Sequence, residues 1–124
     1  MLVRKELTEP VVGAAIEVHR HLGPGLLESV YRQCLVHELC LRGLQVQSEV
    51  SLELDYKGLK VKNAYRIDLL VEGEVVVEVK AVQRMEPVFQ AQALTYMRLR
   101  RAPVGLLINF HVELLRDGIT RLLL

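Results

Sequence analysis

Hydrophobic positions recur with a helical period in the first third of this 124-residue chain. Apolar residues are spaced three or four apart over residues 11–22 and again over Leu26–Leu41. The Thr8-Glu9-Pro10 run is typical of a helix start, and Gly23-Pro24-Gly25 interrupts the pattern between the two stretches. The pattern predicts a hairpin of two helices, the second closed by a left-handed cap at Gly43.

From Leu44 onward the apolar residues alternate with polar ones, which is typical of strands. The alternation predicts three antiparallel strands. The pattern after them predicts a helix that ends near Arg101, a buried central strand and a tail that forms a small hairpin. These segments run from Leu44 to the turn at Lys57-Gly58, from Leu59 to Val71, from Glu74 to Val82 after a turn at Glu72-Gly73, from Pro87 to Arg101, from Val104 to Phe110, and through the turn at Asp117-Gly118.

This order of elements predicts a mixed α/β fold in which helices pack on a twisted sheet. The length suits one hydrophobic core, so a single domain over residues 1–124 is expected. No apolar run approaches the roughly 20 residues of a membrane helix, and the first ten residues lack the apolar stretch of a signal peptide. We therefore expect no membrane span and a cytoplasmic location.

The charge of the chain is small overall but unevenly distributed. A formal net charge of +1 argues against a protein that holds nucleic acid mainly by a large positive field. Residues 1–56 carry 5 basic and 8 acidic side chains, whereas residues 57–124 carry 11 basic and 7 acidic ones. The second half would therefore supply most of any phosphate-facing surface. For Arg98, Arg100 and Arg101 the alternative is a solvated helix end that the helix dipole favours.

Three charged residues stand inside apolar strand segments. Alternation places Glu78 and Lys80 on one face of their strand, about 7 Å apart. Asp68 is a lone carboxylate in the preceding strand, and the turn at Glu72-Gly73 places it within about one residue of the position opposite Glu78. Charges in such apolar surroundings are costly to bury without partners.

Two facing carboxylates repel each other unless a proton or a cation lies between them. A hard divalent ion such as Mg²⁺, held by carboxylates, backbone oxygen and water, would resolve that conflict. Lys80 beside such an ion could orient or deprotonate a water and stabilise charge that grows on a phosphate. The alternative is an ordinary cross-strand salt-bridge cluster on a solvated sheet face, for which the spacing is equally suitable.

Six segments of the chain stand out as motifs. They are Gly25-Leu-Leu-Glu28-Ser-Val-Tyr31, Tyr65-Arg-Ile-Asp-Leu-Leu-Val71, Val77-Glu-Val-Lys-Ala81, Gln92-Ala-Leu-Thr-Tyr96, Gly105-Leu-Leu-Ile-Asn-Phe110 and Asp117-Gly-Ile-Thr-Arg121. In content and order they resemble the bacterial GxxExxY protein family, a branch of the PD-(D/E)XK nuclease superfamily, whose naming motif the first segment matches. The resemblance covers nearly the whole chain from Val11.

The resemblance implies a restriction-endonuclease-like core, with a four-stranded mixed β-sheet flanked by helices. It implies that the catalytic residues are Asp68, Glu78, Lys80, Glu28 and Gln92. The metal, Mg²⁺ or Mn²⁺, would be held by Asp68, Glu78, the backbone carbonyl of Val79 and Glu28. For Tyr31 and Tyr96 we expect core packing with the hydroxyl at the edge.

The chain departs from the family pattern at two positions. Ile67 precedes Asp68 in place of the superfamily's proline, and Phe89 stands where many family members carry histidine.

Two functions follow from these observations. The first is a metal-dependent nuclease that hydrolyses phosphodiester bonds of DNA or RNA. The alternative is a catalytically inactive nuclease-fold protein that binds or assembles with a partner. A domain of this size with few basic residues would reach a duplex more easily as a homodimer or with a protein partner.

Overall fold

The computed structural model describes residues 5–124 and contains three α-helices, one short 3₁₀ helix and five strands. In chain order these are α1 (Lys5–Leu22), α2 (Glu28–Leu41), β1 (Val46–Tyr56), β2 (Leu59–Val71), β3 (Val75–Lys80), α3 (Pro87–Arg100), β4 (Val104–Asn109), η1 (Leu115–Gly118) and β5 (Ile119–Leu123). The order predicted from the sequence is confirmed as far as β4.

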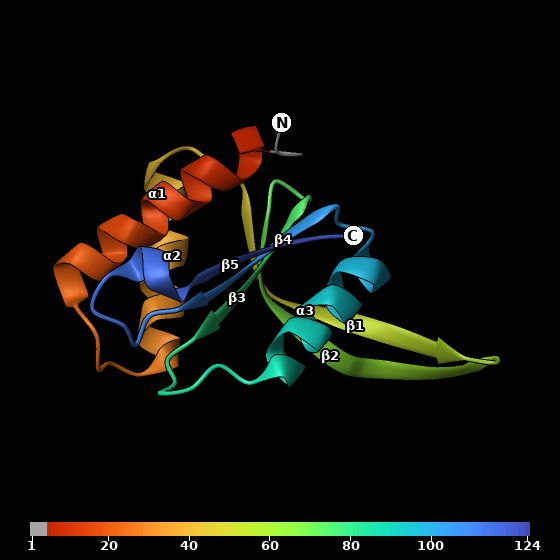
Figure 1. The fold of residues 1–124 in the computed structure, drawn as a ribbon. Helices are drawn as coiled ribbons and strands as arrows, with labels where there is room; N and C mark the ends of the chain where they lie inside the picture. Colours follow the sequence, from red (N-terminus) through yellow and green to blue (C-terminus); the bar gives the residue numbers. More distant parts are fainter. Residues whose placement is uncertain (1–4) are drawn as a thin grey trace.

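The five strands form one mixed sheet in the order β1-β2-β3-β4-β5. Only β3 and β4 run parallel, and α3 is the crossover that connects them. Helices α1 and α2 lie together on one side of the sheet and α3 on the other, while the far end of the β1–β2 ribbon extends beyond α3 (Figure 1). A helix on each side covers the parallel pair, as buried parallel strands require.

The sheet has five strands, so the prediction of four strands with a separate C-terminal hairpin was wrong. Asp117 and Gly118 lie in η1, and the residues after them form β5, which pairs antiparallel with β4 along its whole length. The weakly alternating tail therefore completes the sheet, because Leu122 packs into a core that the rest of the chain has already built.

The start of the first helix also differs from the prediction. Helix α1 already includes Lys5, so Thr8 and Pro10 lie inside it, and the Thr8 hydroxyl donates to the Lys5 carbonyl oxygen. This close to a helix start, Pro10 removes only one backbone hydrogen bond. The gain from burying the apolar face of α1 outweighs that cost. Gly43, with a φ of 80°, adopts the left-handed conformation predicted for the cap of α2.

Two hydrophobic cores lie on opposite faces of the sheet. Val46, Leu69 and Val71 pack into the core under α1 and α2. Farther along the same ribbon, Leu52 and Ile67 pack into the core under α3. Leu70 also packs into the core under α3, so it is the odd-numbered residues of β2 that change face at Asp68, between Ile67 and Leu69.

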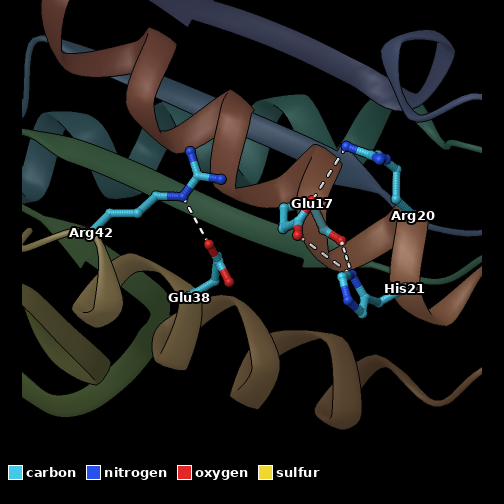
Figure 2. Close-up of polar contacts among 5 residues, drawn as sticks. All are labelled: Glu17, Arg20, His21, Glu38 and Arg42. Atoms are coloured by element: carbon cyan, nitrogen blue, oxygen red, sulfur yellow. Dashed lines mark hydrogen bonds and ion pairs between the residues drawn. The ribbon is translucent and has the colours of Figure 1, made fainter.

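Several ion pairs on the helix hairpin join residues of the same helix. Glu17 pairs with Arg20 and His21 along α1, and Glu38 pairs with Arg42 at the end of α2 (Figure 2). Such exposed pairs contribute about 0–1 kcal/mol each. Buried apolar residues therefore hold the two helices on the sheet.

None of the helices in residues 5–124 has the length and apolar character needed to cross a membrane.

The Gly118→Ala substitution should destabilise the protein by about 2 kcal/mol or more, because the new Cβ has no space. It would lie 2.2 Å from the Asn109 carbonyl oxygen, which belongs to the backbone. Urea unfolding would measure the loss. The control is Gly13→Ala, whose Cβ meets only the end of the Arg42 side chain and which should stabilise α1 by up to about 1 kcal/mol. A Gly118→Ala protein as stable as the wild type would contradict this close approach of Gly118 to the Asn109 backbone.

Candidate active site

Asp68 and Glu78 face each other where β2 and β3 separate. The antiparallel register pairs Leu69 with Val77 and continues to Asp68 opposite Glu78, but backbone pairing ends before it. Hydrogen bonds to the two side chains take the place of the backbone pairing. The Asp68 amide donates to Glu78 Oε2 and the Val79 amide donates to Asp68 Oδ2, each at 2.8 Å. The predicted proximity of the two carboxylates is confirmed, and each carboxylate is held by the backbone of the other strand.

The salt-bridge alternative does not describe this cluster. Glu78 is only 6% exposed, so it does not stand on a solvated sheet face. Within residues 5–124, no ion pair joins Lys80 to Asp68, Glu78 or Glu28. The Lys80 ammonium lies instead over the Phe89 ring of α3, 4.5 Å from its centroid. Phe89 thus holds the lysine by a cation–π contact.

Tyr31 positions the loop that leads to Glu28. The Tyr31 hydroxyl donates to the Gly23 carbonyl oxygen and accepts from the Leu26 amide, and its ring stacks on Phe110 at 4.6 Å. Tyr31 is fully buried, which confirms the core role expected for it. Glu28 is consequently fixed as the first residue of α2, at the end of the helix nearest the strand carboxylates.

The three carboxyl groups interact unfavourably with one another. Burial and then the charge of Asp68 raise the pKa of Glu78 from its ordinary 4.5 to about 8. Burial also raises the pKa of Asp68, although the hydrogen bond from Val79 opposes the shift. The pKa of Glu28 is raised by burial and then by Asp68. Lys80 acts in the opposite direction on all three groups, so these side chains share one electrostatic environment.

The donor atoms fit a hard divalent cation. Asp68 Oδ1 and Glu78 Oε1 accept no hydrogen bond within the described chain, so one oxygen of each carboxylate remains open to a ligand. The Val79 carbonyl and the Glu28 carboxylate would complete an all-oxygen set of the kind that Mg²⁺ prefers. No three Asp, Glu, His or Cys side chains among residues 5–124 are already gathered closely enough to hold a metal. Glu28 would therefore have to shift toward the pair.

Helix α3 contributes Tyr96 to this environment. Tyr96 is 8% exposed, and burial together with the charges of Glu78 and Asp68 raises the pKa of its phenol. Gln92, one turn earlier, is exposed on α3 and makes no hydrogen bond to the site residues within residues 5–124. A direct role for Gln92 stays a prediction.

Sequence reasoning missed Asn109, which is buried. Its side chain accepts from the Val82 amide at 3.1 Å and donates to the Val82 carbonyl oxygen at 2.9 Å, which fixes the chain just after Lys80. An amide in an otherwise apolar strand was the available signal.

Two arginines near the carboxylates were also missed. Arg32 and Arg66 both act to lower the pKa of Asp68 against the effect of burial. Their spacing was a signal: Arg32 follows Glu28 by one helical turn, and Arg66 precedes Asp68 by two strand positions.

A family model described as the PD-(D/E)XK nuclease superfamily matches residues 5–122. No curated protein and no solved structure matches the chain significantly.

Proposed function

Because the chain belongs to the PD-(D/E)XK nuclease superfamily, we propose that it is a metal-dependent nuclease that hydrolyses phosphodiester bonds of DNA or RNA. One observation carries the proposal: Asp68 and Glu78 are held face to face by each other's backbone, without a basic ion-pair partner between them. A structural role would not need two facing acids whose pKa values are both raised by burial, that of Glu78 also by the charge of Asp68.

Asp68, Glu78, the Val79 carbonyl and Glu28 would hold Mg²⁺ or Mn²⁺. When bound, the ion would polarise the phosphodiester and lower the pKa of a water. Lys80 orients the attacking water and stabilises the negative charge that develops on the phosphate, while Phe89 keeps its ammonium at the site. Tyr96 and Gln92 would support the site from α3.

The finer assignment to the GxxExxY family is also part of this proposal. Tyr31 ties down the loop between α1 and α2 with two hydrogen bonds, and Glu28 then begins α2 beside the strand carboxylates. This explains the motif in structural terms. Tyr31 is buried in the core and holds the loop, and the loop positions the Glu28 carboxylate.

The test is a cleavage assay with linear, single-stranded and branched DNA and RNA in the presence of Mg²⁺, Mn²⁺ or EDTA. Cleavage that requires the divalent ion, together with Mn²⁺ binding measured by calorimetry, would support the nuclease and identify its substrate. Absence of both cleavage and Mn²⁺ binding would overturn the proposal in favour of the inactive nuclease-fold protein that binds or assembles with a partner.

A further inference from the structure

Two arginines converge on a single carboxylate oxygen close to the candidate active site. Arg32 Nη2 lies 3.5 Å from Glu49 Oε1, and Arg66 Nη2 lies 3.4 Å from the same atom. Arg32 comes from α2, Glu49 from β1 and Arg66 from β2. Three elements therefore bring two guanidinium groups to a point where one negatively charged oxygen is bound.

This cluster lies directly beside the strand carboxylates. Ser48 pairs with Leu69 and Val50 pairs with Ile67, so Glu49 stands across β1–β2 from Asp68. Arg32 is one helical turn from Glu28, and the positive charges of Arg32 and Arg66 both lower the pKa of Asp68. A phosphate that reached the two guanidinium groups would therefore also be near Asp68.

The exposure of the three side chains suits exchange of the acid for a ligand. The Arg32 side chain is 18% exposed and thus largely fixed, whereas Glu49 and Arg66 are 42% and 64% exposed and can move. Glu49 also has a φ of 55°, a left-handed conformation that is unfavourable for a residue with a side chain. Partly exposed ion pairs are weak, so a phosphate could readily take the place of the Glu49 carboxylate.

We propose that Arg32 and Arg66 form a clamp for a phosphodiester of the nucleic acid, and that Glu49 occupies the clamp in the free protein as an internal substitute for the phosphate. The proposal rests on the nuclease function proposed above and adds to it the residues that bind the substrate backbone. Guanidinium groups suit this task because their planar donors bind two phosphate oxygens at once. Displacement of Glu49 by the substrate then places the phosphate against the carboxylate pair.

The experiment measures binding without cleavage. Short fluorescein-labelled single-stranded and duplex DNA, and the matching RNA, are titrated with protein in EDTA and followed by fluorescence anisotropy. Glu49→Gln should bind about two- to fivefold more tightly than the wild type, because a competing charge is removed. Arg32→Gln and Arg66→Gln should each bind about tenfold more weakly. The slope of log K against the logarithm of the salt concentration should also be shallower by about one, which corresponds to the loss of one phosphate contact.

Matched controls remove the same charges elsewhere. Glu53→Gln neutralises another acid of β1 that is similarly exposed and pairs with Lys60, and Arg42→Gln neutralises the arginine that pairs with Glu38 after α2 (Figure 2). Both should bind as the wild type does. The wild-type protein also provides a measurement that no substitution can disturb: the NMR signals of the Arg32 and Arg66 Nε groups should shift when the oligonucleotide is added.

The outcomes separate the two proposals. If the wild type cleaves nucleic acid, but the Glu49 and arginine variants bind and cleave as it does, the clamp is wrong and the nuclease stands. If Glu49→Gln binds more weakly than the wild type, the three residues are a structural ion-pair cluster and the clamp is overturned. If the wild type neither binds nor cleaves any probe, both proposals fall together.

Discussion

Lys80→Ala and Asp68→Ala should each reduce metal-dependent phosphodiester cleavage by at least about 10³-fold. The two substitutions act on different steps. Lys80→Ala removes the charge proposed to stabilise the transition state but leaves the carboxylate pair and its backbone hydrogen bonds in place. Asp68→Ala removes a proposed metal ligand and leaves the Val79 amide without its acceptor. Cleavage rates and Mn²⁺ calorimetry on both variants provide the measurement.

The expected pattern is specific. Lys80→Ala should lose kcat and keep Mn²⁺ binding, whereas Asp68→Ala should lose both. Lys62→Ala and Asp55→Ala remove the same charges from the exposed β1–β2 ribbon and should retain activity. An active Lys80→Ala enzyme would show that the lysine does not act on the reacting phosphate, and an active Asp68→Ala enzyme would exclude the carboxylate pair as the metal site.

Glu78 should make the metal-free protein less stable as the pH rises from about 5 to about 8. The pKa of Glu78 is raised in the folded state from 4.5 to about 8 by burial and by Asp68. Below pH 4.5 the group is protonated in both states and costs nothing. Between the two values the unfolded chain releases its proton first, so the free energy of unfolding falls as the pH rises and levels off above the folded pKa. The total loss would be on the order of 5 kcal/mol, since each unit of pKa difference corresponds to about 1.4 kcal/mol.

Urea unfolding in EDTA across this pH range measures the effect, and Glu78→Gln should remove much of the pH dependence while stabilising the protein at pH 8. Glu53→Gln is the control, because Glu53 is half-exposed and pairs with Lys60. Added Mg²⁺ or Mn²⁺ should stabilise the wild type more at pH 8 than at pH 5, because deprotonated carboxylates bind the cation. If the free energy of unfolding fell equally with pH in the wild type and in Glu78→Gln, the pKa of Glu78 would not be raised in the folded protein.

Much of the sheet was predictable because strand pairing here depends on local features. The alternation after Leu44 and the two-residue turn at Lys57-Gly58 set the β1–β2 ribbon, and both turn residues have the positive φ that such a turn requires. The second turn proved one residue longer: Val71 pairs with Val75, so Glu72, Gly73 and Glu74 lie between the paired positions. That extra residue places Asp68 directly opposite Glu78 rather than one position away.

The predictions that were wrong concern segments whose local pattern is weak. The helix-start signature at Thr8 was overruled by burial of the apolar face of α1. The tail after Asp117 became the fifth strand because β4 offered an unpaired edge and Gly118 allows the chain to pass close to the Asn109 carbonyl.

The sequence by itself therefore determined the helix hairpin, the meander and the facing pair Asp68 and Glu78, since these depend on neighbours that are close along the chain. For Glu28 the motif gave only an expectation, and the tertiary structure places it where Asp68 raises its pKa. Tertiary structure alone decided that Arg32 and Arg66 converge on Glu49. The physical reason is that hydrophobic periodicity specifies which face of an element is buried. The rotation and position of α2 against the sheet follow only when the whole core is packed, and those determine which charges meet.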